Sequence, residues 1–153
     1  MSDSESVVNH YKQKDLVGKI LAGIEQLGMT SNTVTVEDLA PVDEFHIGGR
    51  TATKSFLDTL SIGKNEYVLD VGCGIGGTSR FVAHTYGCRV AGIDLMKEFI
   101  ETGTTLNQWL GLKQKVILTQ GNVLELDFAD ATFDKTLMLH VGMNISDKFR
   151  LMK

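Results

Sequence analysis

The feature that most constrains the fold is a glycine-rich turn between an apolar run and a helical pattern. Residues 67–71 form a near-continuous apolar run, which is typical of a strand buried on both faces of a parallel sheet. Four glycines occupy the next six positions, and a helical pattern begins at Thr78. Glycine lets the backbone turn tightly and approach a ligand, and the first N–H groups of the helix point to the same place. The stretch predicts the nucleotide- or phosphate-binding opening of a doubly wound α/β fold.

Two glycine patterns fit this turn. Gly72, Gly74 and Gly77 satisfy the G-x-G-x-x-G pattern of dinucleotide sites. With Gly76 in place of Gly77, the same turn satisfies a G-x-G-x-G pattern. Asp70 distinguishes the two, because a carboxylate at the end of the strand would repel a pyrophosphate but would suit the ammonium of an amino-acid moiety. Asp70 therefore favours the second pattern.

Length and composition exclude several classes of protein. A chain of 153 residues fits one domain. The formal net charge of −4, with no basic cluster, argues against nucleic acid as a partner. No apolar run approaches the roughly 18–20 residues of a membrane span, and the polar start is unlike a secretory signal. Cys73 and Cys88 lack metal-ligand spacing and suit reduced thiols. We therefore expect a cytoplasmic protein with no metal and no nucleic-acid or membrane partner.

Strand and helix patterns alternate along the rest of the chain. Strands are expected at residues 67–71, 89–95, 116–120 and 135–141, and helices at 7–27, 51–60, 78–86 and 97–110. This order predicts a doubly wound parallel sheet with helices on both faces (residues 61–153), preceded by a helical cap or lid (residues 1–60). Ligands of such sheets bind beyond the carboxyl ends of the strands, where Asp70, Asp94, Asn122 and His140 are expected.

The stretch around Asp70 resembles motif I of the class I S-adenosylmethionine-dependent methyltransferases, which is hydrophobic–hydrophobic–Asp–hydrophobic–Gly-x-Gly-x-Gly. This family has a Rossmann-like fold. The resemblance implies that S-adenosylmethionine is the cofactor. It also implies that Asp70 acts on the methionine ammonium and that Gly72, Gly74 and Gly76 form the binding turn.

Two later stretches extend the resemblance. Asp94 with Leu95 resembles the acid after the second strand, which holds the ribose hydroxyls of the cofactor. Residues 121–123, Gly-Asn-Val, resemble the family's Gly-Asp-Ala/Val stretch. There the resemblance implies that the side chain of Asn122 takes the adenine amino group and that the backbone N–H of Val123 meets the ring. Asn122 stands where Asp is commoner, and its carbonyl oxygen can still accept a hydrogen bond from the amine.

A narrower resemblance concerns residues 139–148 and 46–49. They are similar to small-molecule N-methyltransferases that act on sarcosine and dimethylglycine or on phosphoethanolamine. The resemblance implies a catalytic pair of Tyr11 and His140 over the substrate amine, with His46 and Ile47 at the cofactor. Histidine suits this role because it can take a proton near neutral pH. Arg50 is a candidate partner for a substrate carboxylate or phosphate.

The sequence ends just inside the helix after the fourth expected strand. Class I methyltransferases have seven strands, so strands five to seven are missing, and the fourth strand would be an exposed apolar edge. We therefore expect a fragment of a longer methyltransferase or self-association through that strand. Glycine-derived amines, phosphoethanolamine, and a quinone or sterol carbon are all compatible acceptors. Two other functions stay open: an NAD-dependent oxidoreductase, and a non-catalytic methyltransferase-like partner subunit.

Overall fold

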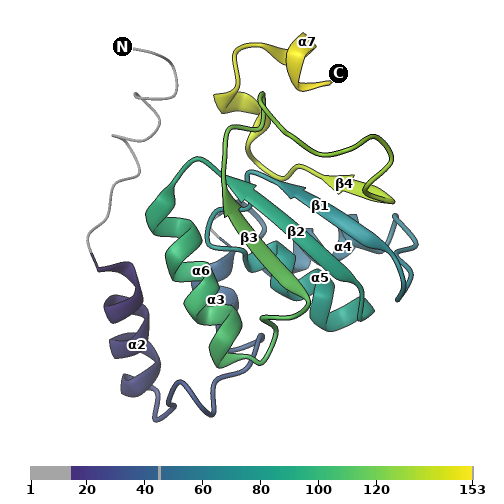
Figure 1. Ribbon diagram of the computed structural model, residues 1–153. Coiled ribbons are helices and arrows are strands. Elements are labelled where there is room, and N and C mark those ends of the chain that lie inside the picture. Colours follow the sequence, from purple (N-terminus) through teal and green to yellow (C-terminus); the bar gives the residue numbers. More distant parts are fainter. Residues whose placement is uncertain (1–14, 45, 153) are drawn as a thin grey trace.

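A four-stranded parallel sheet forms the centre of the molecule in the computed structural model, which describes residues 15–44 and 46–152 (Figure 1). The strand order is β3-β2-β1-β4. The strands are β1 (Tyr67–Val71), β2 (Arg89–Asp94), β3 (Val116–Gln120) and β4 (Lys135–Leu137). All three strand pairs are parallel, and the register places Asp70 beside Gly92 and Leu137. The carboxyl ends of the strands therefore meet at one edge, and the α/β fold class is confirmed.

Helices cover the two faces of this sheet unequally. They are α2 (Leu16–Gln26), α3 (Ala40–Asp43), α4 (Gly49–Leu57), α5 (Gly77–Tyr86), α6 (Lys97–Trp109), the 3-10 turn η1 (Gly142–Asn144) and α7 (Lys148–Leu151). Side chains of α4 and α5 pack on the face that carries Val68 and Val90, and Gly103 of α6 lies against Leu118 on the same face. On the opposite face, the loop after β3 and the short α7 pack over Leu69, Val71, Ala91 and Ile93.

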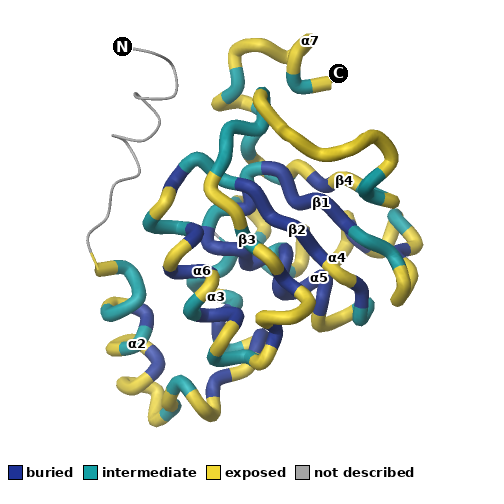
Figure 2. Tube along the Cα trace, in the orientation of Figure 1, coloured by how far each residue is buried: buried dark blue, intermediate teal, exposed yellow. Residues whose placement is uncertain are grey.

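The central strands are buried because they carry apolar side chains on both faces. Val68 and Val90 are fully buried on one face, and Leu69 and Ile93 are at most 5% exposed on the other. Burying an aliphatic side chain of this size contributes about 1.5–3 kcal/mol. Figure 2 shows β1 and β2 as buried segments and the loop between β3 and β4 as largely exposed.

The N-terminal segment packs on the outside of α6. Ile20 and Ile24 of α2 belong to one buried cluster with Leu39 and with Leu106 of α6. Helix α2 begins at Leu16, where the side chain of Asp15 accepts a hydrogen bond from the N–H of Gly18 at 3.1 Å. The helix expected at residues 7–27 is thus confirmed for residues 16–26, and residues 7–14 lie outside the described part of the chain. Within residues 15–44 and 46–152, no helix combines the length and apolarity needed to cross a membrane.

The fourth strand is shorter than predicted. It ends at Leu137 instead of residue 141, so the expectation that His140 lies at a strand end is wrong. Within the described residues β4 pairs with β1 alone, and β1 ends at Val71, opposite Met138 in this register. Residues 139–141 therefore have no strand beside them in that part of the chain. His140 adopts a left-handed backbone conformation with φ 55°, which is uncommon for a residue other than glycine.

Candidate ligand-binding site

A pocket of about 500 Å³ lies beyond the carboxyl ends of β1 and β2. Its wall includes the glycine turn (residues 72–75), residues 94–96 after β2, Val123 after β3, and residues 139–141 after β4. Leu16, Asp43 and His46 close it from the N-terminal segment. The pocket therefore combines both parts of the chain, at the place where ligands of open α/β sheets bind.

The glycine turn needs its glycines. Gly72, Gly74 and Gly76 have φ values of 71°, 55° and 80°, in the left-handed region that side chains disfavour. A Cβ on Gly72 would lie 2.3 Å from a methyl group of Val141, so the loop after β4 packs directly on this glycine. Gly76 is the N-cap of α5. The turn thus brings the start of α5 and the residues around His140 to the same pocket.

Asp94 links the end of β2 to this turn and lines the pocket. Its Oδ2 accepts a hydrogen bond from the N–H of Gly74 at 2.9 Å, and its Oδ1 accepts one from the N–H of Met96 at 2.9 Å. Burial raises the pKa of Asp94, and the backbone N–H groups act against that rise. Each carboxylate oxygen keeps a further lone pair, so Asp94 can accept hydrogen bonds from a bound ligand.

Asp70 lies beneath the turn, away from the pocket wall. Its side chain is buried, and its Oδ2 accepts a hydrogen bond of 2.6 Å from the hydroxyl of Ser79. Burial raises the pKa of Asp70 to about 6, and the negative charge of Asp94 adds to the rise while Ser79 opposes it. The structure thus ties Asp70 to the first turn of α5 through Ser79, and the contact of Asp70 with the methionine ammonium stays a prediction.

Of the other residues predicted to contact the cofactor, some line the pocket and some do not. Leu95 and Val123 line the pocket. Asn122 does not, because its Oδ1 accepts a hydrogen bond from the N–H of Leu124 at 3.0 Å and so closes a local turn. Ile47 is 93% exposed and also lies outside the pocket wall. Asn122 and Ile47 thus lie outside the described pocket wall, and their contacts with the cofactor stay predictions.

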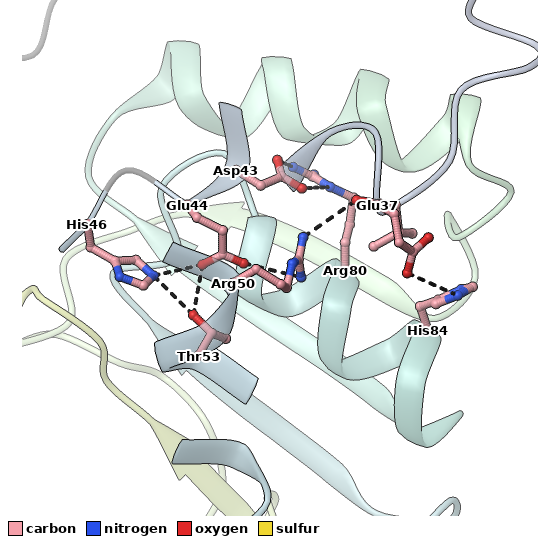
Figure 3. A network of polar contacts seen from close by, with 9 residues as sticks. Glu37, Asp43, Glu44, His46, Arg50, Thr53, Arg80 and His84 are labelled. Atoms are coloured by element: carbon pink, nitrogen blue, oxygen red, sulfur yellow. Dashed lines mark hydrogen bonds and ion pairs between the residues drawn. The ribbon is translucent and has the colours of Figure 1, made fainter. Parts of the chain in front are cut away.

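Two histidines from distant parts of the chain stack in the pocket. The rings of His46 and His140 are 4.5 Å apart between centroids and inclined by only 12°. The Nε2 of His46 lies 2.7 Å from Oε2 of Glu44, and the hydroxyl of Thr53 donates to the same oxygen at 2.8 Å (Figure 3). Sequence reasoning missed Glu44 and Thr53. The one sequence signal that could have indicated a Glu44–His46 pair is that the two residues lie two positions apart.

Arg50 does not face the pocket. Its guanidinium lies 3.2 Å from Oε1 of Glu44 and 4.2 Å from the ring centre of Phe81. Figure 3 shows the Glu44 carboxylate between Arg50 and His46. Arg50 thus forms an internal ion pair, and its pairing with a substrate anion stays a prediction. Tyr11, the predicted partner of His140, lies outside the described residues.

A buried ion pair joins the N-terminal segment to α5 at the same site. Arg80 of α5 pairs with Asp43, which lines the pocket, and donates hydrogen bonds to the carbonyl of Ile75 at 2.7 Å and to Oδ1 of Asn107 at 3.1 Å. Burial raises the pKa of Asp43, and the charge of Arg80 opposes that rise. These residues gave no sequence signal. Among residues 15–44 and 46–152, no group of three His, Cys, Asp or Glu side chains is placed to hold a metal ion.

Comparison with curated proteins gives relatives with different substrates in their names. A sterol 24-C-methyltransferase of Eremothecium gossypii is 43% identical over 74 residues, which cover 48% of this chain and 20% of the relative. Phosphoethanolamine N-methyltransferase 3 of Arabidopsis thaliana is 36% identical over 101 residues, which cover 66% of this chain and 20% of the relative. The chain thus spans about a fifth of the length of these relatives.

Comparison with solved structures and with family models agrees with the geometry. A geranyl diphosphate methyltransferase in complex with S-adenosylmethionine superposes with a TM-score of 0.55 at 27% identity, covering 57% of this chain and 36% of that structure. The model of the family described as "Methyltransferase domain" matches residues 68–152, from β1 to the end of α7. This match includes the glycine turn, Asp94, Val123 and His140. The chain belongs to the methyltransferase domain family.

Proposed function

We propose that this chain is the cofactor-binding part of an S-adenosylmethionine-dependent methyltransferase that acts on a small-molecule amine. The observation that carries the proposal is that one pocket is lined by the glycine turn and Asp94 and also by the stacked His46 and His140. A methyl transfer needs a cofactor cradle and a proton acceptor at the same place, and this pocket provides both.

The residues present fit S-adenosylmethionine. Asp94 has lone pairs for the ribose hydroxyls, and Leu95, Met96, Phe99 and Val123 give apolar surface for the adenine ring. The described part of the wall includes Asp43 and Asp94 but no Lys or Arg. A wall that offers no Lys or Arg to a pyrophosphate, and in which Asp94 keeps lone pairs for ligand hydroxyls, supports the methyltransferase over the NAD-dependent oxidoreductase.

The chain's own residues then have separable tasks. When bound, S-adenosylmethionine supplies a methyl group activated by a positively charged sulfur. The glycine turn and Asp94 orient the cofactor, and most of the rate comes from holding donor and acceptor in line. An ammonium has no free lone pair, so His140 takes its proton and leaves the amine able to attack.

The amine is supported by one named relative and by the histidine pair. The Arabidopsis relative is named for phosphoethanolamine, whereas the Eremothecium relative is named for a sterol carbon. A proton acceptor is required for a protonated amine, and His140, which lines the pocket and stacks on His46, suits this task. We propose sarcosine, dimethylglycine or phosphoethanolamine as the first acceptors to test.

Calorimetry with S-adenosylmethionine, S-adenosylhomocysteine and NAD tests the cofactor. We expect micromolar binding of the first two and none of NAD. Asp94→Ala should abolish binding, and Val123→Trp, which fills the pocket without touching the carboxylate, should do the same. Asp58→Ala removes an exposed carboxylate outside the pocket wall and is the matched control. Binding of NAD alone would replace this proposal with the oxidoreductase.

An acceptor screen then tests catalysis. Methylation of one of the three amines supports the full proposal, and methylation of a sterol or quinone would correct the acceptor. Cofactor binding without turnover, together with a stable complex with a longer chain, would instead indicate a non-catalytic partner subunit. Since the matched segments make up 20% of the relatives, both experiments should include the full-length protein if the chain is part of one.

Two further expectations belong to the same proposal. We propose that β4 pairs with a strand of another chain. Within the described sheet β4 has β1 on one side and no strand on its other side, so it is an edge strand. Light scattering over a dilution series tests this, with Thr136→Pro predicted to reduce association. We also propose a cytoplasmic location, since both Cys73 and Cys88 are free thiols, and fractionation with a tagged protein tests it.

A further inference from the structure

The ring nitrogens of His46 both face oxygen atoms. Nε2 lies 2.7 Å from the carboxylate of Glu44, and Nδ1 lies 3.3 Å from the carbonyl oxygen of Ile47. The hydroxyl of Thr53, 3.0 Å from Nε2, donates its hydrogen to Glu44 and so offers Nε2 a lone pair. A neutral imidazole has one N–H and would turn a bare nitrogen toward one of these acceptors. The surroundings of His46 are thus complementary to an imidazolium.

The ring of His140 lies close enough to the ring of His46 to respond to its charge. Its imidazole is stacked on His46 at 4.5 Å, so a second positive charge there would be repelled. A neutral ring over an imidazolium, in contrast, is attracted to it. His140 reaches this position with a left-handed backbone, φ 55°, which is a strained conformation for a residue other than glycine. Strained residues of this kind are concentrated at functional sites.

We propose that Glu44 holds His46 as an imidazolium and thereby keeps His140 neutral, so that His140 is the proton acceptor and Glu44 and His46 are its positioning residues. The catalytic meaning of this arrangement rests on the proposed function. The step is a proton transfer: an N–H bond of the substrate ammonium breaks, the proton binds the free ring nitrogen of His140, and the electron pair stays on the amine. His46 has no free lone pair in this arrangement and cannot take that proton.

The other charges around the pair are already neutralised or held by other partners. Arg50 pairs with the second oxygen of Glu44 at 3.2 Å. Asp43 pairs with Arg80, and Asp94 accepts two backbone N–H groups. The side chains of His46 and Glu44 are only 11% and 3% exposed, so water screens their contact weakly.

Nitrogen-15 NMR of the ring nitrogens at about pH 7 tests the assignment without any substrate. Uniformly labelled chain is used, and signals are assigned from the loss of one set in each His→Gln variant. We expect both nitrogens of His46 to show the shift of a protonated nitrogen, and one nitrogen of His140 to show that of an unprotonated one. In Glu44→Gln, one nitrogen of His46 should lose its proton.

The chain offers a matched control in His84 and Glu37, a histidine and a carboxylate 3.9 Å apart with side chains 52% and 68% exposed (Figure 3). Glu37→Gln should leave the signals of His46 and His140 unchanged. An unprotonated nitrogen on His46 in the unmodified chain would overturn the proposal, and so would unchanged His46 signals in Glu44→Gln. If Glu44→Gln does not fold, the spectrum of the unmodified chain decides. If the NMR spectrum is as predicted but calorimetry finds no binding of S-adenosylmethionine, the charge assignment is upheld and the proposed function is rejected.

Discussion

The guanidinium of Arg80 and the carboxylate of Asp43 form an ion pair in which neither side chain is exposed to solvent. Asp43 ends α3, whereas Arg80 lies on α5 and also donates hydrogen bonds to Ile75 in the glycine turn and to Asn107 on α6. One side chain thus joins the N-terminal segment, the turn and two helices. The pair fixes the part of the pocket wall that comes from before the first strand.

Replacing Arg80 by methionine should destabilise the fold strongly. Arg80→Met keeps an unbranched apolar stem but leaves Asp43 buried without its partner, which we expect to cost about 3–5 kcal/mol of unfolding free energy. Urea denaturation measures this. The double variant Arg80→Met with Asp43→Asn should recover part of the loss. Lys54→Met, which removes an exposed ion pair with Asp58, should change stability little. Equal losses in Arg80→Met and Lys54→Met would contradict the prediction.

The buried carboxyl of Asp70 should make stability depend on pH. Its pKa is about 6 in the folded chain and 3.8 ordinarily, so the folded state binds a proton more tightly between these values. The stabilisation is fully present below about pH 4 and is lost as pH rises through about 6. Asp70→Asn removes this titration and keeps an acceptor for Ser79. Between about pH 5 and pH 7, the unmodified chain should lose about 1 kcal/mol relative to Asp70→Asn in urea denaturation.

Ser79→Ala provides the companion measurement for Asp70. The hydroxyl of Ser79 donates to the carboxylate and lowers the pKa of Asp70, so its removal should raise that pKa further. The loss of stability should then extend to higher pH than in the unmodified chain. Parallel stability curves for the unmodified chain and Asp70→Asn would show that Asp70 does not titrate in this range.

The contact between Gly72 and Val141 should make Gly72→Ala more damaging than Gly74→Ala. Both glycines have left-handed backbones, so both substitutions cost about 1–2 kcal/mol in conformation. A Cβ on Gly74 meets no atom within 4 Å, whereas one on Gly72 would overlap Val141. We expect Gly72→Ala to lose at least about 1 kcal/mol more in urea denaturation and to shift the NMR signals of the neighbouring His140. An equal loss in both variants would refute the contact.

Local patterns in the sequence were sufficient for the sheet and for half of the pocket. The strands at residues 67–71 and 116–120 have the predicted bounds, and the glycine turn and Asp94 lie where the pattern placed them. These features depend on neighbours in sequence: apolar runs form buried strands, and parallel strands bring their carboxyl ends together. The fourth strand was predicted too long, because its length depends on where its partner β1 turns away.

The sequence by itself determined the parallel α/β fold and the chemistry of the glycine turn, since each follows from residue types within a few positions of one another. Only the tertiary structure decided that His46 stacks on His140, that Glu44 holds His46, and that Asp43 pairs with Arg80 across 37 positions. Such contacts depend on how α3 and the loop after β4 pack against the sheet. That packing is set by the whole core, so no local pattern encodes it.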